Sequence, residues 1–338
     1  MSRLSTTYLG LELRTPLVAS AGPLTRDPRS AVRLQEGGAS AVVLPSLFEE
    51  EIIHEQTQFS RALDVGSEIF AEALHYFPDV SAFVTTGDRY LESIQTMKAE
   101  LDIPVIGSLN ATSLGGWARY ARQIEAAGAD ALELNLYRIA TDAYLSGSSA
   151  EGNDIGIIRE VKESIGIPLS VKLSPYYTTM ACFARQATMP GGADGLVLFN
   201  RFYQPELDPD TREAVPRVEL SQPWELRLPV MWTAILRSRL PKSVSLAVTT
   251  GVYSGRDAAK GLLAGADAVM MCAAPLLHGP HHFATVEREL EEWMDRNEYD
   301  SVEQLKGSAS YLASDNPGAW ERANYVRTLH SYTTPDLL

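Results

Sequence analysis

The stretch LAVTTGVYSGRDAAKGLLAGADAVMMCAAPLL, residues 246–277, predicts a strand, a tight turn, a helix, a second strand and a loop. Its two short apolar runs, 246–248 and 268–271, suit buried strands. Between them Ser254 can cap the start of a helix, and Gly265 is the kind of residue that follows a helix end. The stretch therefore indicates two parallel strands joined by one helix.

Small residues follow both strands, namely Thr249, Thr250 and Gly251 after the first and Cys272, Ala273 and Ala274 after the second. Small side chains let a ligand approach the backbone, and adjacent parallel strands then present free N–H groups side by side. Strands seven and eight of a (β/α)8 barrel are the usual place for a phosphate site of this kind. The alternative is an ordinary βαβ unit, because glycine-rich turns are common there.

A repeat extends this pattern along the chain. Four times a helical stretch ends in Gly-Ala-Asp or Gly-Ala-Ser and enters an apolar run, at residues 41–44, 131–134, 195–199 and 268–271. Four further runs, each introduced by a proline, alternate with these at residues 17–19, 105–109, 169–173 and 244–248. Eight buried strands alternating with helices predict an α/β fold, a closed (β/α)8 TIM barrel. An open doubly wound sheet is the alternative, but no Gly-x-Gly-x-x-Gly turn follows the first strand.

Stretches of mixed apolar and charged character predict helices over residues 29–36, 89–101, 117–127, 155–164, 180–186, 230–238, 255–264 and 283–294. Three connections exceed a standard strand-to-helix loop, at residues 45–88, 137–153 and 201–229. Long loops at the C-terminal face of a barrel usually build the active site, and the third should contain a hairpin around residues 208–210. We expect the barrel to occupy residues 1–306 and a C-terminal extension to occupy residues 307–338.

Composition narrows the class of protein. The chain has 338 residues, 45% of them hydrophobic, which is enough for one large barrel. Its net charge of −14 argues against nucleic acid and anionic membrane as partners. Cys182 and Cys272 are its two cysteines and suggest no disulfide, which favours a reducing compartment and hence the cytoplasm. No signal pattern opens the chain, and no apolar run approaches the roughly 20 residues of a bilayer span.

Polar residues lie at the C-terminal ends of the predicted strands, where catalytic groups of this fold are found. They are Asn110, Asn135, Asn200 and Lys172. Asparagine amides both donate and accept hydrogen bonds, which suits the polar edge of a ring. An ammonium inside an apolar strand needs an anion nearby, so Lys172 either pairs with Glu133 on the neighbouring strand or faces an electron-rich ring.

Two arginines and a group of histidines are further candidates. Arg138 and Arg201 follow strands four and six and can clamp a substrate carboxylate, with ordinary surface arginines as the alternative. His278, His281 and His282 lack the carboxylate spacing of a metal site. We therefore expect no metal there, and we interpret these histidines as the solvated start of the last barrel helix.

These motifs resemble those of the dihydroorotate dehydrogenase family, whose members are FMN-binding barrels. Residues 133–136 read Glu-Leu-Asn-Leu, as in the family. Residues 171–176 read Val-Lys-Leu-Ser-Pro-Tyr and are similar to its Val-Lys-Leu-Pro-Pro-Tyr, while residues 19–22 resemble its Ala-Ser-Gly turn. The resemblance covers most of residues 8–306.

The resemblance implies an FMN site made of Ser20, Ala21, Gly22, Asn110, Asn135, Lys172, Thr250, Gly251, Ala273 and Ala274. It implies catalysis by Lys172, Asn135 and Asn200, and contacts to a small-molecule substrate from Asn135, Arg138, Asn200 and Arg201. The implied reaction oxidises (S)-dihydroorotate to orotate, a step of pyrimidine biosynthesis, or acts on a closely related CH–CH substrate by hydride transfer to the flavin. The resemblance is to the soluble class of the family, whose members are homodimers.

Departures from the family pattern fall in the substrate loops. Arg138 stands where the family has a Cys or Ser general base, and arginine cannot accept a proton at neutral pH. Pro45 replaces a lysine near the flavin, and an Asn-Ser-Met-Gly stretch that binds orotate is absent from residues 45–88. The loop 144–149 is one place from which a substitute base could come, but nothing in the sequence singles out a residue there. Two other hypotheses therefore remain open, a flavoprotein with another substrate or electron-transfer role and a barrel without catalysis that serves as a partner subunit.

Overall fold

The structure is a computed structural model that describes residues 2–48, 51, 85–110, 117–201, 204–321 and 323–331. Most of the long connection expected over residues 45–88 lies outside these described residues. Within the described ranges, no helix is both long and apolar enough to span a bilayer.

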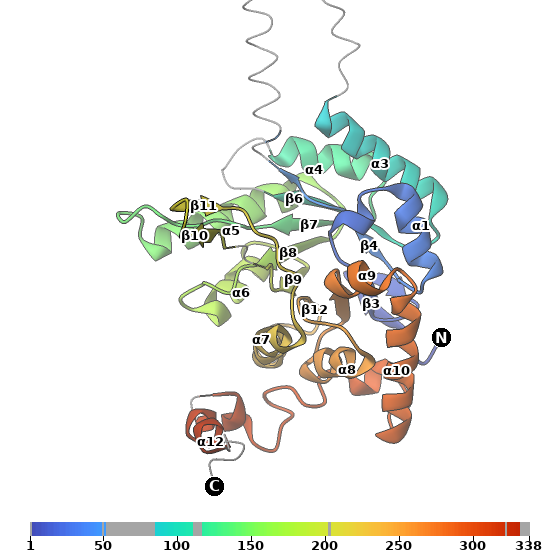
Figure 1. Cartoon of the computed structure of the whole chain (residues 1–338), viewed down its shortest axis with the longest axis vertical. Coiled ribbons are helices and arrows are strands. Elements are labelled where there is room, and N and C mark those ends of the chain that lie inside the picture. Colours follow the sequence, from blue (N-terminus) through green and yellow to red (C-terminus); the bar gives the residue numbers. More distant parts are fainter. Residues whose placement is uncertain are drawn as a thin grey trace, which may run out of the picture.

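Among the described residues, eight parallel strands form a closed ring (Figure 1). In ring order they are β3 (Leu17–Ala19), β4 (Val42–Val43), β6 (Val105–Asn110), β7 (Ala131–Asn135), β8 (Leu169–Leu173), β9 (Gly195–Leu198), β12 (Ser245–Val248) and β13 (Ala268–Met271). β13 pairs with β3, which closes the ring, and the short β5 (Leu47–Phe48) pairs with the end of β6. The predicted (β/α)8 barrel is therefore confirmed.

Helices cover the outside of this barrel (Figure 1). They are α1 (Pro28–Glu36), α3 (Thr86–Glu100), α4 (Trp117–Ala126), α5 (Gly147–Ser164), α6 (Met180–Thr188), α7 (Arg227–Arg237), α8 (Gly255–Ala264) and α10 (His282–Arg296). The sequence predicted each of them, but α5 begins at Gly147 rather than at residue 155. The Ser146 hydroxyl accepts a hydrogen bond from the Ser149 N–H at 3.2 Å and caps this earlier start, so the second half of the expected 137–153 loop is helical.

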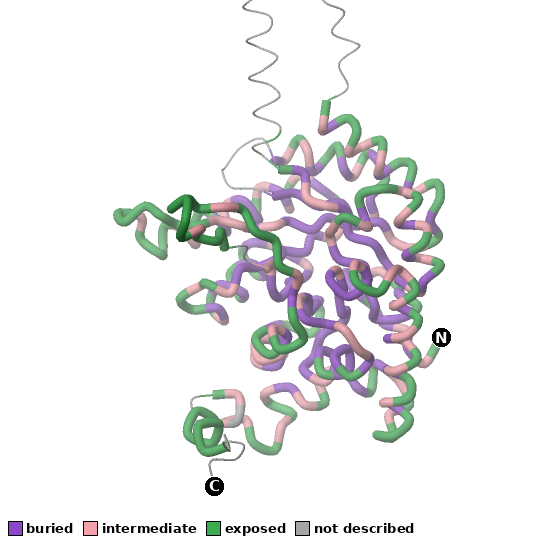
Figure 2. Tube along the Cα trace, viewed as in Figure 1, coloured by how far each residue is buried: buried purple, intermediate pink, exposed green. Residues whose placement is uncertain are grey.

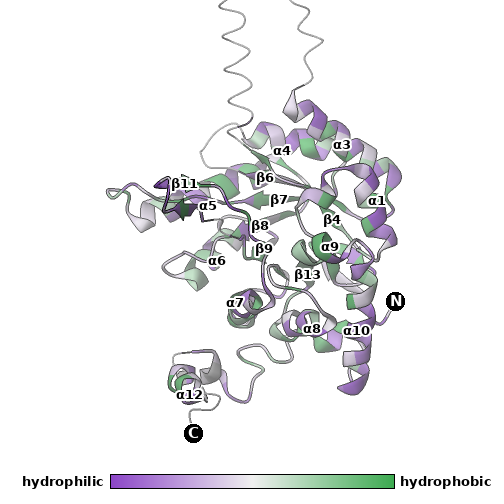
Figure 3. Ribbon diagram, viewed as in Figure 1, coloured by the Kyte–Doolittle hydropathy of each residue, from purple (hydrophilic) through white to green (hydrophobic). Residues whose placement is uncertain are grey.

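Alternate residues of each strand face the two sides of the barrel wall. In β9, Val197 packs with the cluster inside the barrel, whereas Leu196 and Leu198 pack with the cluster under the helices. The hairpin of β1 (Thr6–Tyr8) and β2 (Leu11–Leu13) contributes the fully buried Tyr8 to the inner cluster. Burial is therefore concentrated on the strands (Figure 2), while hydrophilic residues lie on the outer faces of the helices (Figure 3).

The Gly-Ala-Asp repeat has a structural explanation. Its glycines, Gly38, Gly128, Gly192 and Gly265, all adopt positive φ at helix ends. In three repeats the carboxylate accepts a hydrogen bond from a strand amide, as Asp130 does from Val105 (2.7 Å), Asp194 from Leu169 (2.8 Å) and Asp267 from Leu246 (2.9 Å). The same three carboxylates pair with Lys98, Lys162 and Arg237 at 2.7, 2.7 and 2.5 Å. Each aspartate thus links two neighbouring strands and a helix at the N-terminal end of the barrel.

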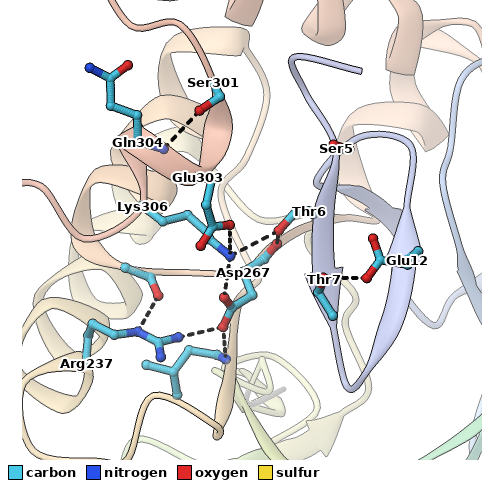
Figure 4. A network of polar contacts seen from close by, with 12 residues as sticks. Ser5, Thr6, Thr7, Glu12, Arg237, Asp267, Ser301, Glu303, Gln304 and Lys306 are labelled. Atoms are coloured by element: carbon cyan, nitrogen blue, oxygen red, sulfur yellow. Dashed lines mark hydrogen bonds and ion pairs between the residues drawn. The ribbon is translucent and has the colours of Figure 1, made fainter. Parts of the chain in front are cut away.

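The chain after α10 remains attached to this end of the barrel. Following α11 (Val302–Leu305), the Lys306 ammonium lies 3.0 Å from Asp267 (Figure 4). Tyr311 donates its backbone N–H to the Ala234 carbonyl at 3.0 Å. η4 (Pro317–Trp320) and α12 (Ala323–Ser331) come next, and α12 lies apart from the barrel helices in Figure 1. The division of the chain at residue 306 stays a prediction.

A short hairpin and two short helices complete the connections that follow β9 and β13. β10 (Glu206–Asp208) and β11 (Glu213–Val215) form the antiparallel hairpin predicted within residues 201–229, and η3 (Pro223–Leu226) leads from there into α7. After β13, α9 (Ala273–His278) is a helix where the sequence predicted a loop. That expectation was wrong because small residues, which suit a ligand-binding turn, are equally compatible with helix.

Candidate functional site

A cavity of about 510 Å³ opens at the C-terminal ends of the strands. It brings together most of the residues singled out in the sequence: Ser20, Ala21, Gly22, Asn110, Asn135, Lys172, Asn200, Arg201, Thr250, Gly251 and Ala273. Parallel strands that end at one edge of a closed barrel bring distant sequence positions into one cavity. Arg138 and Ala274 are not among the lining residues, and Ala274 is fully buried in α9.

Lys172 is the cation of this cavity wall that is most deeply buried. Its side chain is 7% exposed, and its Nζ lies 3.1 Å from Glu133 Oε1 and 3.4 Å from Ser20 Oγ. The side chain of Glu133 is 1% exposed. The two interpretations of Lys172 are therefore compatible, because the ammonium pairs with Glu133 and also lines the cavity.

Two of the three asparagines are bonded to each other. The Asn200 side-chain amide donates to Asn135 Oδ1 at 2.9 Å, and the Asn200 backbone N–H donates to the Leu173 carbonyl at 2.7 Å. Asn110 is buried in the same wall, at the end of β6. An amide has two N–H donors, so the Asn135–Asn200 pair keeps donors available for a polar ring.

Glycines allow close packing where the cavity meets β3 and β12. A Cβ on Gly22 would lie 2.4 Å from Cys272 Sγ, and a Cβ on Gly251 would lie 2.7 Å from the Leu226 backbone nitrogen. Gly251 also has a φ of +80°, which L side chains rarely adopt. Its N–H was expected to be free, but it donates to Ser221 Oγ at 3.4 Å, because the long connection before α7 folds back over this turn.

Arg138 lies in a separate hollow of about 350 Å³ between the β7–α5 and β8–α6 connections. It forms an ion pair and a hydrogen bond with Asp154 of α5, and it donates to the Ala150 carbonyl at 3.1 Å. Burial raises the pKa of Asp154 to about 6, although Arg138 lowers it and the Tyr177 hydroxyl donates to this carboxyl at 3.4 Å. The buried carboxylate of Asp154 thus draws Arg138 away from the main cavity.

Arg201 lines the main cavity, whereas the loop 144–149, from which a substitute base could come, does not. The Nε atom of Arg201 lies 3.4 Å from Glu225 Oε1. The loop 144–149 does not reach that cavity, because Ser146 caps α5 and the Tyr144 side chain is 98% exposed. Only one of the two arginines therefore stays a candidate for binding a substrate anion in this cavity.

The histidines at the end of α9 and the start of α10 form contacts within the protein. His282 Nε2 lies 2.8 Å from the Tyr253 carbonyl oxygen, and the rings of His278 and His282 are 4.8 Å apart. Within the part of the chain that the structure describes, no three His, Cys, Asp or Glu residues gather as a metal site.

Several lining residues were not predicted. Apolar and aromatic side chains complete the cavity wall, and the unpredicted residues include Phe48, Tyr137, Phe199, Val218, Leu220, Ser221 and Leu276. Val218, Leu220 and Ser221 belong to the long connection 201–229, whose length was the available signal. Burial raises the pKa of the Cys272 thiol, with Lys172 acting in the opposite direction, so this residue lines the cavity as a thiol at neutral pH.

Comparisons with known proteins agree with this geometry. The family described as dihydroorotate dehydrogenase matches residues 84–294. Dihydroorotate dehydrogenase B (NAD(+)), catalytic subunit, from Thermoplasma volcanium is 26% identical over 91% of this chain and 99% of its own length. The protein of the same name from Methanothermobacter thermautotrophicus is 28% identical over 90% and 98%. A chloroplastic dihydropyrimidine dehydrogenase (NADP(+)) from Arabidopsis thaliana is 25% identical over 90% of this chain and 76% of its own length.

Proposed function

The chain belongs to the dihydroorotate dehydrogenase family, and from this premise we propose that it is an FMN-dependent dehydrogenase that oxidises a CH–CH bond of a dihydropyrimidine-type ring. (S)-dihydroorotate is the first candidate substrate. The observation that carries the proposal is the position of Lys172, which is held by Glu133 and Ser20 and lines a cavity with three asparagines.

The residues present fit a flavin mononucleotide. A volume of about 510 Å³ lies within the range of roughly 300–1,000 Å³ that is usual for small-molecule sites. Gly22 and Gly251 line the cavity, and the absence of a Cβ there lets Cys272 and the backbone around Leu226 pack closely behind its wall. Ser20, Asn110 and Lys172 supply a hydroxyl, an amide and an ammonium for the polar edge of a ring, and Gly251 and Ala273 are the positions for the phosphate.

The chain's own residues would orient both rings and stabilise charge. A bound FMN would supply the hydride acceptor. Lys172 would stabilise negative charge on a ring bound in the cavity, because a cation in a partly dry site interacts strongly with nearby charge. The Asn135–Asn200 pair hydrogen-bonds the polar edge of the substrate, while the buried Phe199 and Met271 exclude water from part of the wall.

The second substrate candidate is a dihydropyrimidine without a carboxylate. Arg138, at the position of the family's general base, points into the second hollow and pairs with Asp154. Arg201 lines the main cavity, where it pairs with Glu225. Because both arginines pair with carboxylates of the protein, a neutral ring is the compound to compare with dihydroorotate. The expected homodimer stays a prediction, which sedimentation of the purified chain would test.

Absorbance of the purified protein tests the proposal. We expect a yellow protein that releases FMN, not FAD, on denaturation, and whose visible flavin band bleaches anaerobically with dihydroorotate or with dihydrouracil. Colourless protein that takes up no added FMN would refute the cofactor and favour a partner-subunit role. Bound FMN that neither compound reduces would refute the substrate class while leaving the cofactor intact.

A further inference from the structure

The interior of the barrel below the cavity contains a buried carboxylate with an incomplete set of partners. Glu133 Oε1 bonds to the Lys172 ammonium, but no described residue donates a hydrogen bond to Glu133 Oε2. The hydroxyl of Tyr8, which is fully buried, lies in the same interior. A buried carboxylate whose hydrogen bond comes from its counter-ion is stabilised chiefly by that counter-ion.

The charge of Glu133 acts on two tyrosine hydroxyls, that of Tyr8 in β1 and that of Tyr90 in α3. Burial raises the pKa of both Tyr8 and Tyr90, and the charge of Glu133 raises each of them further. Within the described residues, Lys172 is the cation that pairs with Glu133. The ammonium thus has a carboxylate below it and the cavity above it.

The strand register accounts for this arrangement. On β7 and β8, Asn135 lies opposite Lys172 and Glu133 lies opposite Ser170. Glu133 is therefore one inward-facing layer below Asn135 and Lys172, and its long side chain reaches the Nζ atom at 3.1 Å. Ser20 from β3 approaches the same ammonium at 3.4 Å from across the barrel.

We propose that Glu133 is a positioning residue that holds Lys172 at the cavity wall and partly neutralises the positive charge presented to the bound ring. The proposal rests on the proposed function, since the ring is taken to be FMN. Lys172 alone would favour the reduced form of a ring that gains negative charge. With Glu133 beside it, the wall presents an ion pair, so the preference for the reduced form is weaker than a lone cation would give.

The test compares how strongly the protein binds oxidised and reduced FMN. In Glu133→Gln the side chain keeps its shape and its hydrogen-bond acceptor but loses its charge. We expect the ratio of affinities for reduced over oxidised FMN to rise at least about tenfold, which raises the two-electron midpoint potential by about 30 mV. Thr233→Val, a change at a fully buried hydroxyl on α7 that also lacks a partner, is the matched control and should leave the potential unchanged.

The Lys172→Met variant separates an effect of Glu133 that acts through Lys172 from a direct effect of Glu133 on the bound ring. In Lys172→Met, a lone buried Glu133 should take up a proton, so adding Glu133→Gln to that variant should change the affinity ratio less than about threefold. Glu133→Asp, which keeps the charge farther from Nζ, should raise the potential by a smaller amount. This variant also provides the comparison if Glu133→Gln does not fold.

Two results for Glu133→Gln would overturn the proposal, and a third result, for the unaltered protein, would instead refute the proposed function. A folded Glu133→Gln variant with a lower thermal midpoint and an unchanged potential would make the pair purely structural and overturn the proposal. A lower potential would also overturn it, because Lys172 would then depend on Glu133 to remain protonated. If the unaltered protein binds no FMN in either oxidation state, the proposed function fails first, and this inference fails with it.

Discussion

Of the three repeat aspartates, Asp130, Asp194 and Asp267, we expect Asp267 to be the one whose replacement by alanine destabilises the fold most. Its two oxygens contact the Arg237 guanidinium at 2.5 Å, the Lys306 ammonium at 3.0 Å and the Leu246 N–H at 2.9 Å (Figure 4). The side chains of Arg237, Asp267 and Lys306 are 15%, 13% and 13% exposed. Asp267→Ala would leave two largely shielded cations and one amide without their shared acceptor.

Breaking a buried ion pair by removing one partner costs about 3–5 kcal/mol, and we expect Asp267→Ala to fall in this range. Asp130 and Asp194 are the matched controls within the chain. Each binds one lysine and one strand amide, and their side chains are 27% and 40% exposed. Solvent screening reduces the value of such pairs, so each alanine change there should cost about 1–2 kcal/mol.

Denaturant unfolding of the three alanine variants measures these costs, and an FMN titration of each folded variant serves as the functional control. The Asp267 network lies at the N-terminal end of the barrel, whereas the cavity opens at the C-terminal ends of the strands. FMN affinity should therefore change less than about threefold in all three variants. Equal losses of stability at Asp267, Asp130 and Asp194 would refute the reasoning, because the second cation would then contribute nothing.

Three other changes test the cavity and the second hollow. Ala273→Asp should abolish FMN retention in a folded protein, because a carboxylate would face the expected phosphate; unchanged affinity by titration would place the phosphate elsewhere. Gly251→Ala should weaken FMN binding at least about tenfold, because its Cβ would lie 2.7 Å from the Leu226 nitrogen at a φ of +80°, and a normal titration curve would contradict this. Burial raises the pKa of Asp154 to about 6, so its contribution to stability is full near pH 4 and is lost as the pH rises through 6. Asp154→Asn should remove up to about 3 kcal/mol from the decline in unfolding free energy between pH 4 and 7, and an identical pH profile in the variant would disprove the assignment.

Local signals account for the parts of the fold that were predicted. Glycines with positive φ, such as Gly265, mark helix ends because the chain must leave the helix within one residue. Ser254 caps α8 by accepting a hydrogen bond from the Asp257 N–H at 3.2 Å, an interaction between residues three apart. The start of α5 was mispredicted because the residues from Gly147 to Gly152 contain no apolar pattern, and the Ser146 cap decides the boundary instead.

The candidate site was predicted as far as strand ends determine it. Asn135 and Lys172 lie at the ends of β7 and β8, and Asn200 lies two residues after β9. Parallel strands of a closed barrel all end at the same face. The strand ends do not determine where the side chain of a loop residue points. Arg138 turns away from this face because a carboxylate of α5, Asp154, attracts it, and nothing in the local sequence specifies that contact.

The sequence by itself determined the barrel, its strand ends and the residue types gathered at its mouth, because periodicity, caps and proline positions act over a few residues. The tertiary structure alone decided which charges meet. Glu133 and Lys172 are 39 residues apart, and Lys172 and Ser20 are 152 apart. Their contacts follow from strand register and ring closure, which bring distant residues within a few ångströms where water is excluded and electrostatic interactions are strong.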